Sequence, residues 1–176
     1  MPKVFTTDEL ISNSTDIIDQ WTIINENVYE IVNGVTQELD DYINGLPKNM
    51  TNLPDEELEG IIMEIPSLLY WVNSNLEKIG AKEDIAQSFK NKVFRESFLS
   101  GDGSVSLKKI RAEEESYKQE LVEIIYSNAY KTIKNKAEMA FEIMQSAKKI
   151  MNMRVAEFGV SNAISALFNS FIIVVL

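Results

Sequence analysis

Apolar and small residues in the second half of the chain recur with the spacing of one long helix. The stretch from Ser104 to Phe158 contains neither Gly nor Pro, and its seam follows steps of 4, 3, 4, 4, 3, 4, 3, 4, 4 and 3. This spacing is close to the 3.5-residue repeat of helices that pack along a common seam. A single helix of this length cannot bury its own seam, so we expect it to need partner helices. The seam consists of Val122, Tyr126, Ala129, Ile133, Ala137, Ala140, Met144, Ala147, Met151, Val155 and Phe158.

A second apolar seam near the N-terminus predicts another helix. Thr6-Thr7-Asp8-Glu9 fits a capping box at the start of this helix, with Thr6 as the N-cap. Gly34 is a position at which the helix could kink. The outer face is acidic, which indicates either a solvated surface or a docking face that mimics nucleic acid. The seam has steps of 4, 3, 4, 3, 4, 4 and 3 and consists of Ile17, Trp21, Ile24, Val28, Ile31, Val35, Leu39 and Tyr42.

The middle of the chain contains the main helix-breaking signals. Residues 45–54 include two prolines and form a predicted linker. Pro54 begins a short helix that Pro66 ends or kinks, and Gly80 is expected to cap the helix after it. A further helix is expected from about residue 82 to residue 99. The stretch 100–103, Ser-Gly-Asp-Gly, then predicts a tight connection between two helices, with Ser104 or Ser106 capping the long helix.

These patterns predict an all-α, oligomeric protein: a long helical hairpin with coiled-coil-like seams and a helical N-terminal extension. We divide the chain into an acidic N-terminal helical segment (1–45), a linker (46–54), a helical hairpin core (55–158) and an apolar C-terminal tail (159–176). The tail has no charged residue, and its last six residues are all apolar. Three interpretations of the tail remain open: packing in an oligomer core, a membrane anchor, or a reading-frame artefact.

The composition excludes several classes of function. The chain has no Cys and no His, which excludes disulfides, thiolate metal sites and catalysis that depends on either residue. The adjacent acids Glu113, Glu114 and Glu115 point in different directions from a helix, and no Gly-rich phosphate loop is present. We therefore predict no catalytic residue, no metal site, no cofactor and no enzymatic activity. The N-terminus lacks signal-peptide features, so we expect a cytoplasmic protein.

Basic residues gather on both sides of the predicted turn, although the net charge of the chain is −10. Phe94 and Phe98 lie among them. Cations that follow phosphates and rings that stack on bases are the minimal requirements for binding single-stranded nucleic acid. However, Lys and Arg near helix ends are usually capping and solubility residues, and Phe at helical spacing is usually core, so both interpretations stay open. The candidate DNA-binding residues are Lys90, Lys92, Arg95, Lys108, Lys109 and Arg111.

Three short motifs in a fixed order carry a resemblance to a known family. Trp71 lies 24 residues before Arg95, and the stretch 95–101 fits the pattern R-x-x-[YF]-x-S-G. The stretch 153–159 fits M-R-x-x-E-x-G. With this set, the chain resembles the recombination mediator proteins of T4-type bacteriophages, the UvsY-like family, over about residues 65–159.

The resemblance implies an all-helical homo-oligomer arranged as a ring. It also implies binding of single-stranded DNA and help for a RecA-like recombinase that displaces a single-strand-binding protein. The basic pair that contacts DNA in the family maps onto Arg95 and onto Val93, which is not basic, with Lys92 adjacent. The acidic segment before residue 65 and the tail lie outside the pattern.

Small residues in the long seam permit close helix approach, so we expect the C-terminal half of the hairpin to carry assembly. The candidate oligomerisation residues are Ala140, Met144, Ala147, Met151, Arg154 and Phe158. Two other classes remain open. One is a non-enzymatic coiled-coil scaffold or assembly protein that docks through its acidic helix. The other is a tail-anchored membrane protein.

Overall fold

Three helices make up the part of the chain that the structure describes. The structure is a computed structural model, which describes the backbone of residues 17–175 and the side chains of residues 20–158. The helices are α2 (Ile17–Gly45), α3 (Asp55–Ser100) and α4 (Val105–Val175). No strand occurs among these residues, which confirms the predicted all-α class. The capping box at Thr6 lies outside the described residues.

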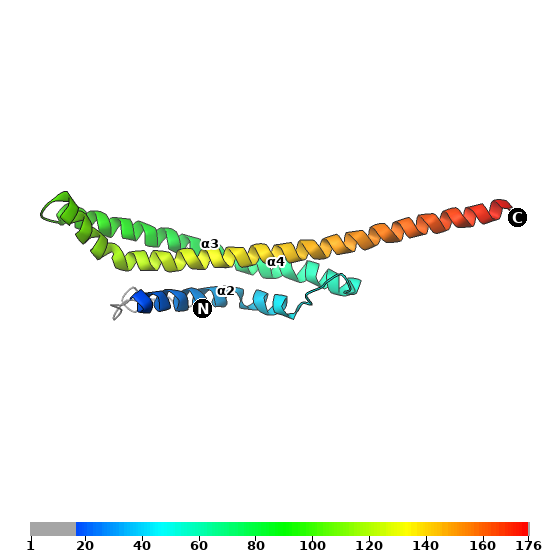
Figure 1. Ribbon diagram of the computed structural model, residues 1–176, viewed down its shortest axis with the longest axis horizontal. Coiled ribbons are helices and arrows are strands. Elements are labelled where there is room, and N and C mark those ends of the chain that lie inside the picture. Colours follow the sequence, from blue (N-terminus) through cyan, green and yellow to red (C-terminus); the bar gives the residue numbers. More distant parts are fainter. Residues whose placement is uncertain (1–16, 176) are drawn as a thin grey trace.

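The helices form a long, narrow bundle (Figure 1). The chain runs along α3 to a tight turn, and α4 returns antiparallel to α3 as the second arm of a hairpin. Helix α2 lies along the hairpin and runs in the same direction as α4. Helix α4 is much longer than its partners and projects past the start of α3.

The core is built from apolar residues of all three helices. Ile61, Ile65 and Val72 of α3, Ile133 of α4 and Leu39 of α2 are all buried members of this core. The small side chains of α4 are fully buried at several seam positions, which lets the helices approach closely. The buried members of the long seam are Ala129, Ile133, Ala137, Ala140, Met144 and Ala147.

Among the residues whose side chains are described, three predicted seam positions are exposed: Trp21 of α2, and Val155 and Phe158 at the end of the long seam. Trp21 is in register with the buried face of α2, yet 67% of its surface is exposed. Ile31 and Leu39, farther along the same face, are buried. Thr36, which the apolar pattern leaves out, is instead fully buried. Its hydroxyl donates to Asp40 Oδ2 at 2.7 Å and lies 3.3 Å from Lys136 Nζ of α4.

No helix ends at Gly34, Pro66 or Gly80, so the predicted helix end at Gly80 is wrong. Helix α2 continues through Gly34, and α3 continues through both Pro66 and Gly80. Apolar residues on either side of these positions pack against the hairpin core, and this tertiary packing outweighs the local preference of Pro and Gly. Pro66 is on the exposed face of α3. Gly80 lies so close to Tyr130 that an added Cβ would be 3.2 Å from the ring carbon Cε2.

The turn between the two arms is where the sequence placed it. The N–H of Gly101 donates to the carbonyl of Ser97 at 2.9 Å and ends α3, and Gly103 adopts a φ of 106°, which favours glycine. The hydroxyl of Ser104 accepts a hydrogen bond from the N–H of Leu107 at 3.4 Å. Ser104, rather than Ser106, therefore caps α4.

Candidate nucleic-acid interface

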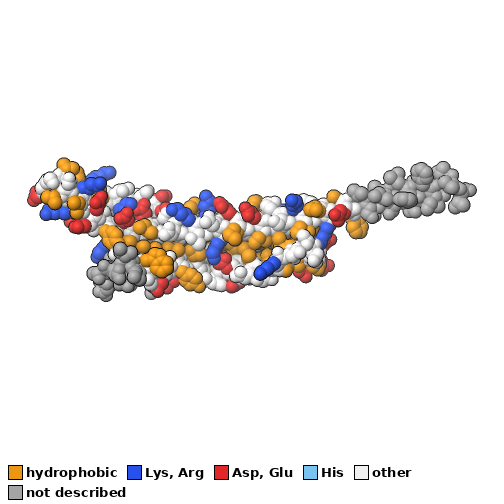
Figure 2. Space-filling model, in the orientation of Figure 1, with side chains coloured by type: hydrophobic (Ala, Val, Ile, Leu, Met, Phe, Trp, Pro, Cys, Tyr) orange, Lys and Arg blue, Asp and Glu red, His pale blue; other side chains and the backbone are white. Residues whose placement is uncertain are grey.

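The turn places the predicted basic residues at one end of the hairpin. Figure 2 shows Lys and Arg side chains beside apolar and acidic ones at this end. Across the arms, Gly101 lies against Lys108 and Lys90 pairs with Glu123. By this pairing, Arg95 on α3 lies farther from the tip of the hairpin than Arg111 on α4.

Lys90 has a structural role in this arrangement. Its Nζ lies 2.5 Å from Glu123 Oε2 of α4, and only 26% of the Lys90 side chain and 18% of the Glu123 side chain are exposed. Gln87 also donates to Glu123, at 3.4 Å. The charge of Lys90 is therefore neutralised within the protein and holds the two arms together, which makes it the least suitable of the six for a phosphate contact.

Lys92 and Lys109 are exposed and paired within their own helices. Lys92 Nζ lies 3.9 Å from Glu96, and Lys109 Nζ lies 3.6 Å from Glu113. Exposed pairs one helical turn apart contribute only about 0.3–0.5 kcal/mol. Such a weak pair can open when a phosphate competes for the lysine.

Arg95, Lys108 and Arg111 have no ion-pair partner among the residues whose side chains the structure describes. Both arginines are exposed, and Lys108 packs its stem over Gly101. Arginine presents a planar fork of donors that matches phosphate oxygens and can stack on a base. These three residues carry the available positive charge of the turn.

The two phenylalanines of the cluster pack on each other. The rings of Phe94 and Phe98 have centroids 6.3 Å apart and planes at 12°, and both are half-buried. They stiffen the end of α3 more than they offer open faces to bases.

Apart from Trp71, the exposed apolar residues on either side of the turn and on the outer face of α3 were not predicted as functional residues. They lie outside the predicted seams, so their helical phase could have marked them as outward-facing. Tyr70 and Trp71, which are 81% and 55% exposed, present open rings on the same helix as Arg95. Around the turn the exposed apolar residues are Leu99, Val105, Leu107 and Ile110.

Acidic residues limit where an anion could bind. Glu96 and Asp102 lie within the basic cluster, and Glu113, Glu114, Tyr117 and Glu120 line a hollow of about 590 Å³ farther along α4. These acids lie close to the basic residues of the turn, so only part of the surface there would attract an anion.

The structure uses most of the predicted oligomerisation residues inside the chain. Ala140, Met144 and Ala147 are buried in its own core, and Met151 is half-buried against that core. Arg154 binds Asp55 Oδ1 at 2.5 Å and the carbonyl of Thr51 at 2.7 Å. These residues of α4 are used within the chain because α3 and α2 pack against the long seam of α4. Only Phe158, at 73% exposure, remains open to a second copy, and oligomerisation stays a prediction.

Comparisons with known proteins give no relative: no family model matches the chain, and neither a curated protein nor a solved structure is similar to it. Within the described residues, no helix is long and apolar enough to cross a membrane. No cluster of three or more acidic residues there could hold a metal ion. The side chains of the C-terminal tail, on which the membrane-anchor interpretation depends, lie outside the described residues.

Proposed function

We propose that this protein is a non-enzymatic accessory factor of DNA recombination. It binds single-stranded DNA and promotes loading of a RecA-like recombinase on strands covered by a single-strand-binding protein. The observation that supports this proposal most is the pair of exposed, unpaired arginines, Arg95 and Arg111, on facing arms of the turn. Arg95 also begins the motif that resembles the recombination mediators.

The binding mode follows from the chemistry of the turn. The two arginines and Lys108 contact phosphates, and Lys92 and Lys109 join when their weak helical pairs open. Such a protein needs no bond-making chemistry. It favours the recombinase filament by binding the strand and its partners more tightly in one state than in the other.

The first test measures binding of a fluorescent oligothymidylate by anisotropy at several salt concentrations. The wild-type protein should bind at low salt and weaken as salt rises. The variant Arg95→Ala/Arg111→Ala should lose affinity, and its slope of log K against log salt should fall by about 0.7 for each lost phosphate contact.

A matched control distinguishes the effect of losing the two arginines at the turn from the effect of changing the net charge. Lys131 and Lys149 are exposed on α4, away from the turn, so Lys131→Ala/Lys149→Ala removes the same charge elsewhere. This control should bind like the wild type. Equal weakening in both variants, or no binding by the wild type at low salt, would contradict the proposal.

The second test addresses the recombinase. Filament assembly by a RecA-like recombinase should be faster on coated single strands when the wild-type protein is added. The Arg95→Ala/Arg111→Ala variant should not produce this increase, whereas the Lys131→Ala/Lys149→Ala control should. If the wild-type protein binds the strand without increasing the rate, the mediator role is wrong although the DNA site remains.

A scaffold or assembly role is the second candidate. Trp21 and Tyr29 are exposed on α2, at 67% and 69%, among its acidic residues. An aromatic side chain surrounded by acids suits a basic partner surface. Deleting α2 would not test this role, because Leu39 is part of the core, so the informative variant is Trp21→Ala/Tyr29→Ala. If the protein is a scaffold, this variant should lose binding to its basic partner protein, whereas Arg95→Ala/Arg111→Ala should keep it.

A further inference from the structure

The α3–α4 hairpin has two long grooves, and α2 fills only one of them. On the α2 side, Lys136 of α4 forms an ion pair with Asp40, and Tyr117 of α4 donates a hydrogen bond to Gln20. Lys134 and Glu138 lie two residues to either side of Lys136 and line a hollow on the other side of the hairpin. Two residues along a helix correspond to a turn of about 200°, so this second groove faces away from α2.

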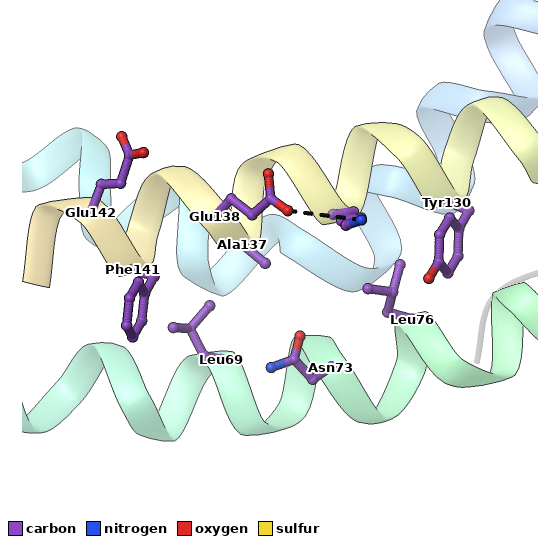
Figure 3. A pocket seen from close by; sticks show the side chains of 9 residues that line it. Leu69, Asn73, Leu76, Tyr130, Ala137, Glu138, Phe141 and Glu142 are labelled. Carbon is purple, nitrogen blue, oxygen red and sulfur yellow. Dashed lines mark ion pairs between the residues drawn. The ribbon is translucent and has the colours of Figure 1, made fainter.

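Among the described residues, the second groove is open, and its lining is mainly apolar with Asn73, Lys134, Glu138 and Glu142 as polar members (Figure 3). It has a volume of about 450 Å³ between α3 and α4. Leu69 and Ala137 are buried in it, Leu76 and Tyr130 are half-buried, and Phe141 is 48% exposed. Lys134 and Glu138 pair with each other at 3.9 Å across one turn of α4, so these two opposite charges offset each other at the groove.

At the other end of the molecule, α4 extends past the helices that pack against it. The Arg154–Asp55 pair marks the end of the bundle, since α3 begins at Asp55. Beyond Arg154, α4 continues alone to Val175 (Figure 1). Val155 and Phe158, at the start of this projection, are 70% and 73% exposed.

The sequence of the projection is typical of a helix that packs against a partner. Residues 159–176 carry no charge, and apolar residues recur at 160, 164, 167, 171 and 175, with steps of 4, 3, 4 and 4. Phe168, four residues after position 164 and three before position 171, shares their helical phase. This is the spacing with which a helix anchors itself in an apolar groove. A lone helix with such a surface in water would be unfavourable.

We propose that the second groove binds the C-terminal projection of a second copy of the chain, in a reciprocal antiparallel pair. The groove runs from Glu142 back to Tyr130, which is 12 to 24 residues before Arg154. At about 1.5 Å per residue these limits lie about 18 and 36 Å from the end of the bundle. The projection reaches at least 21 residues, or about 31 Å, past Arg154. If the two bundles meet end to end at Arg154, residues 166–175 of each copy lie at the level of residues 133–142 of the other.

Charge and topology fit this occupant. The segment has no charge, and it would enter a groove in which Lys134 and Glu138 offset each other. Within one chain the segment cannot reach the groove, because α4 is one continuous helix that leads away from it. The contact is therefore between copies, and its symmetry makes the pair the smallest closed assembly. This inference does not depend on DNA binding.

Mass measurement of the full chain by light scattering tests the pair. The chain mass is 20.0 kDa. As the wild-type protein is diluted, the last assembled species to be seen before single chains appear should have twice this mass. Phe141→Glu places a charge in the groove and should shift the protein to the single-chain mass. Met139→Glu adds the same charge on the same helix at a position that is 63% exposed and does not line the groove, and it should leave the mass unchanged.

A second variant, in the projection, tests the same contact without altering the groove, in case Phe141→Glu misfolds. Phe168→Glu lies beyond the bundle and should also give the single-chain mass, with helical content by circular dichroism close to that of the wild type. A single-chain wild-type protein, or a two-chain mass that survives both Phe141→Glu and Phe168→Glu, would overturn the pair.

Cross-linking tests the register, since the chain has no Cys of its own. Glu138→Cys and Ser170→Cys proteins, mixed and treated with a short bis-maleimide, should form a covalent dimer between the two kinds of chain. Lys118→Cys mixed with Ser170→Cys should form little, because residue 118 lies 20 residues, about 30 Å, from the level of residue 138. Equal cross-linking in both mixtures contradicts the register. Sedimentation of the wild-type protein with phosphatidylcholine vesicles, lost in Phe168→Glu, would assign the projection to a membrane and overturn the proposal.

Discussion

Lys134 and Lys136 lie two residues apart on α4 and have opposite surroundings. Lys136 contacts Asp40 and the buried hydroxyl of Thr36, and 34% of its side chain and 27% of that of Asp40 are exposed. Lys134 pairs only with Glu138, with 55% and 63% of the two side chains exposed. The first pair links α2 to α4 in a partly dry site, whereas the second lies in water. Burial, rather than the presence of a pair, decides what each contributes.

Lys136→Met should therefore lower the free energy of unfolding by about 1 kcal/mol, because Asp40 and Thr36 lose a charged partner in a site only partly screened by solvent. Lys134→Met should change it by less than about 0.5 kcal/mol. Urea unfolding followed by circular dichroism measures both values. Equal effects would mean that the Lys136 contact with α2 adds nothing to stability.

Two tyrosines report burial through their pKa values. Burial raises the pKa of Tyr126 above its ordinary value of 10.0. Burial and then the nearby charge of Glu64 raise the pKa of Tyr42 in the same way. The folded protein therefore holds these two protons more tightly than the unfolded chain does.

Because a raised pKa favours the folded state only while the phenol keeps its proton, stability should fall as pH rises above about 10. In Tyr126→Phe this decline should be shallower than in the wild type. Tyr29→Phe removes a phenol from an exposed position and serves as the control. Urea midpoints measured between pH 9 and about 11 give the comparison, and identical slopes for the wild type and Tyr126→Phe would contradict it.

At the scale of the helix, two glycines of α3 show how local preference and packing compete. An added Cβ at Gly60 would meet nothing within 4 Å, whereas at Gly80 it would lie 3.2 Å from Tyr130. Both glycines lower the helix propensity of α3 by a similar amount. Only Gly80 has a packing reason to be small.

Gly60→Ala should therefore stabilise the protein by about 0.5–1 kcal/mol, through reduced backbone entropy in the unfolded chain. Gly80→Ala should gain less, because the Tyr130 ring must move to admit the methyl group. Thermal unfolding of the two variants beside the wild type decides the order. A larger gain at Gly80 would mean that the contact with Tyr130 is loose.

The helices themselves were largely readable from the sequence. The turn at residues 100–103, the long seam from Ala129 to Ala147 and the α2 seam from Ile31 to Leu39 correspond to observed structure. The predicted helix end at Gly80 was wrong, and no helix ends at Pro66, because a local signal does not include the core contacts on both of its sides. Nor could the pattern reveal that Lys90 meets Glu123, since that contact forms only when the arms fold together.

At the scale of the whole molecule, the length of the particle distinguishes a single chain from a pair of chains. The 71 residues of α4 span about 107 Å as a single helix, and the part from Val105 to Arg154 spans about 75 Å. Among the described helices, only α4 extends past the bundle, which gives the described part of the chain the form of a rod with a thin end (Figure 1).

If two chains pair through their projections with the bundles end to end, the particle should be about 150 Å long, twice the bundle length. Small-angle X-ray scattering of the wild-type protein should give this maximum dimension, and Phe168→Glu should give about 107 Å. A two-chain mass with a maximum dimension near 107 Å would mean that the copies lie side by side, which contradicts the end-to-end arrangement.

The sequence by itself determined that this protein is helical, where its main turn lies, and that it has no Cys or His with which to do chemistry. The tertiary structure decided how those features are used. It assigned most of the long seam to the chain's own core, neutralised Lys90, left Arg95 and Arg111 exposed, and left one groove open. The physical reason is that apolar burial is non-directional, so the same spacing can serve a contact within a chain or between chains. A charge, likewise, becomes available or neutralised only through its neighbours in space.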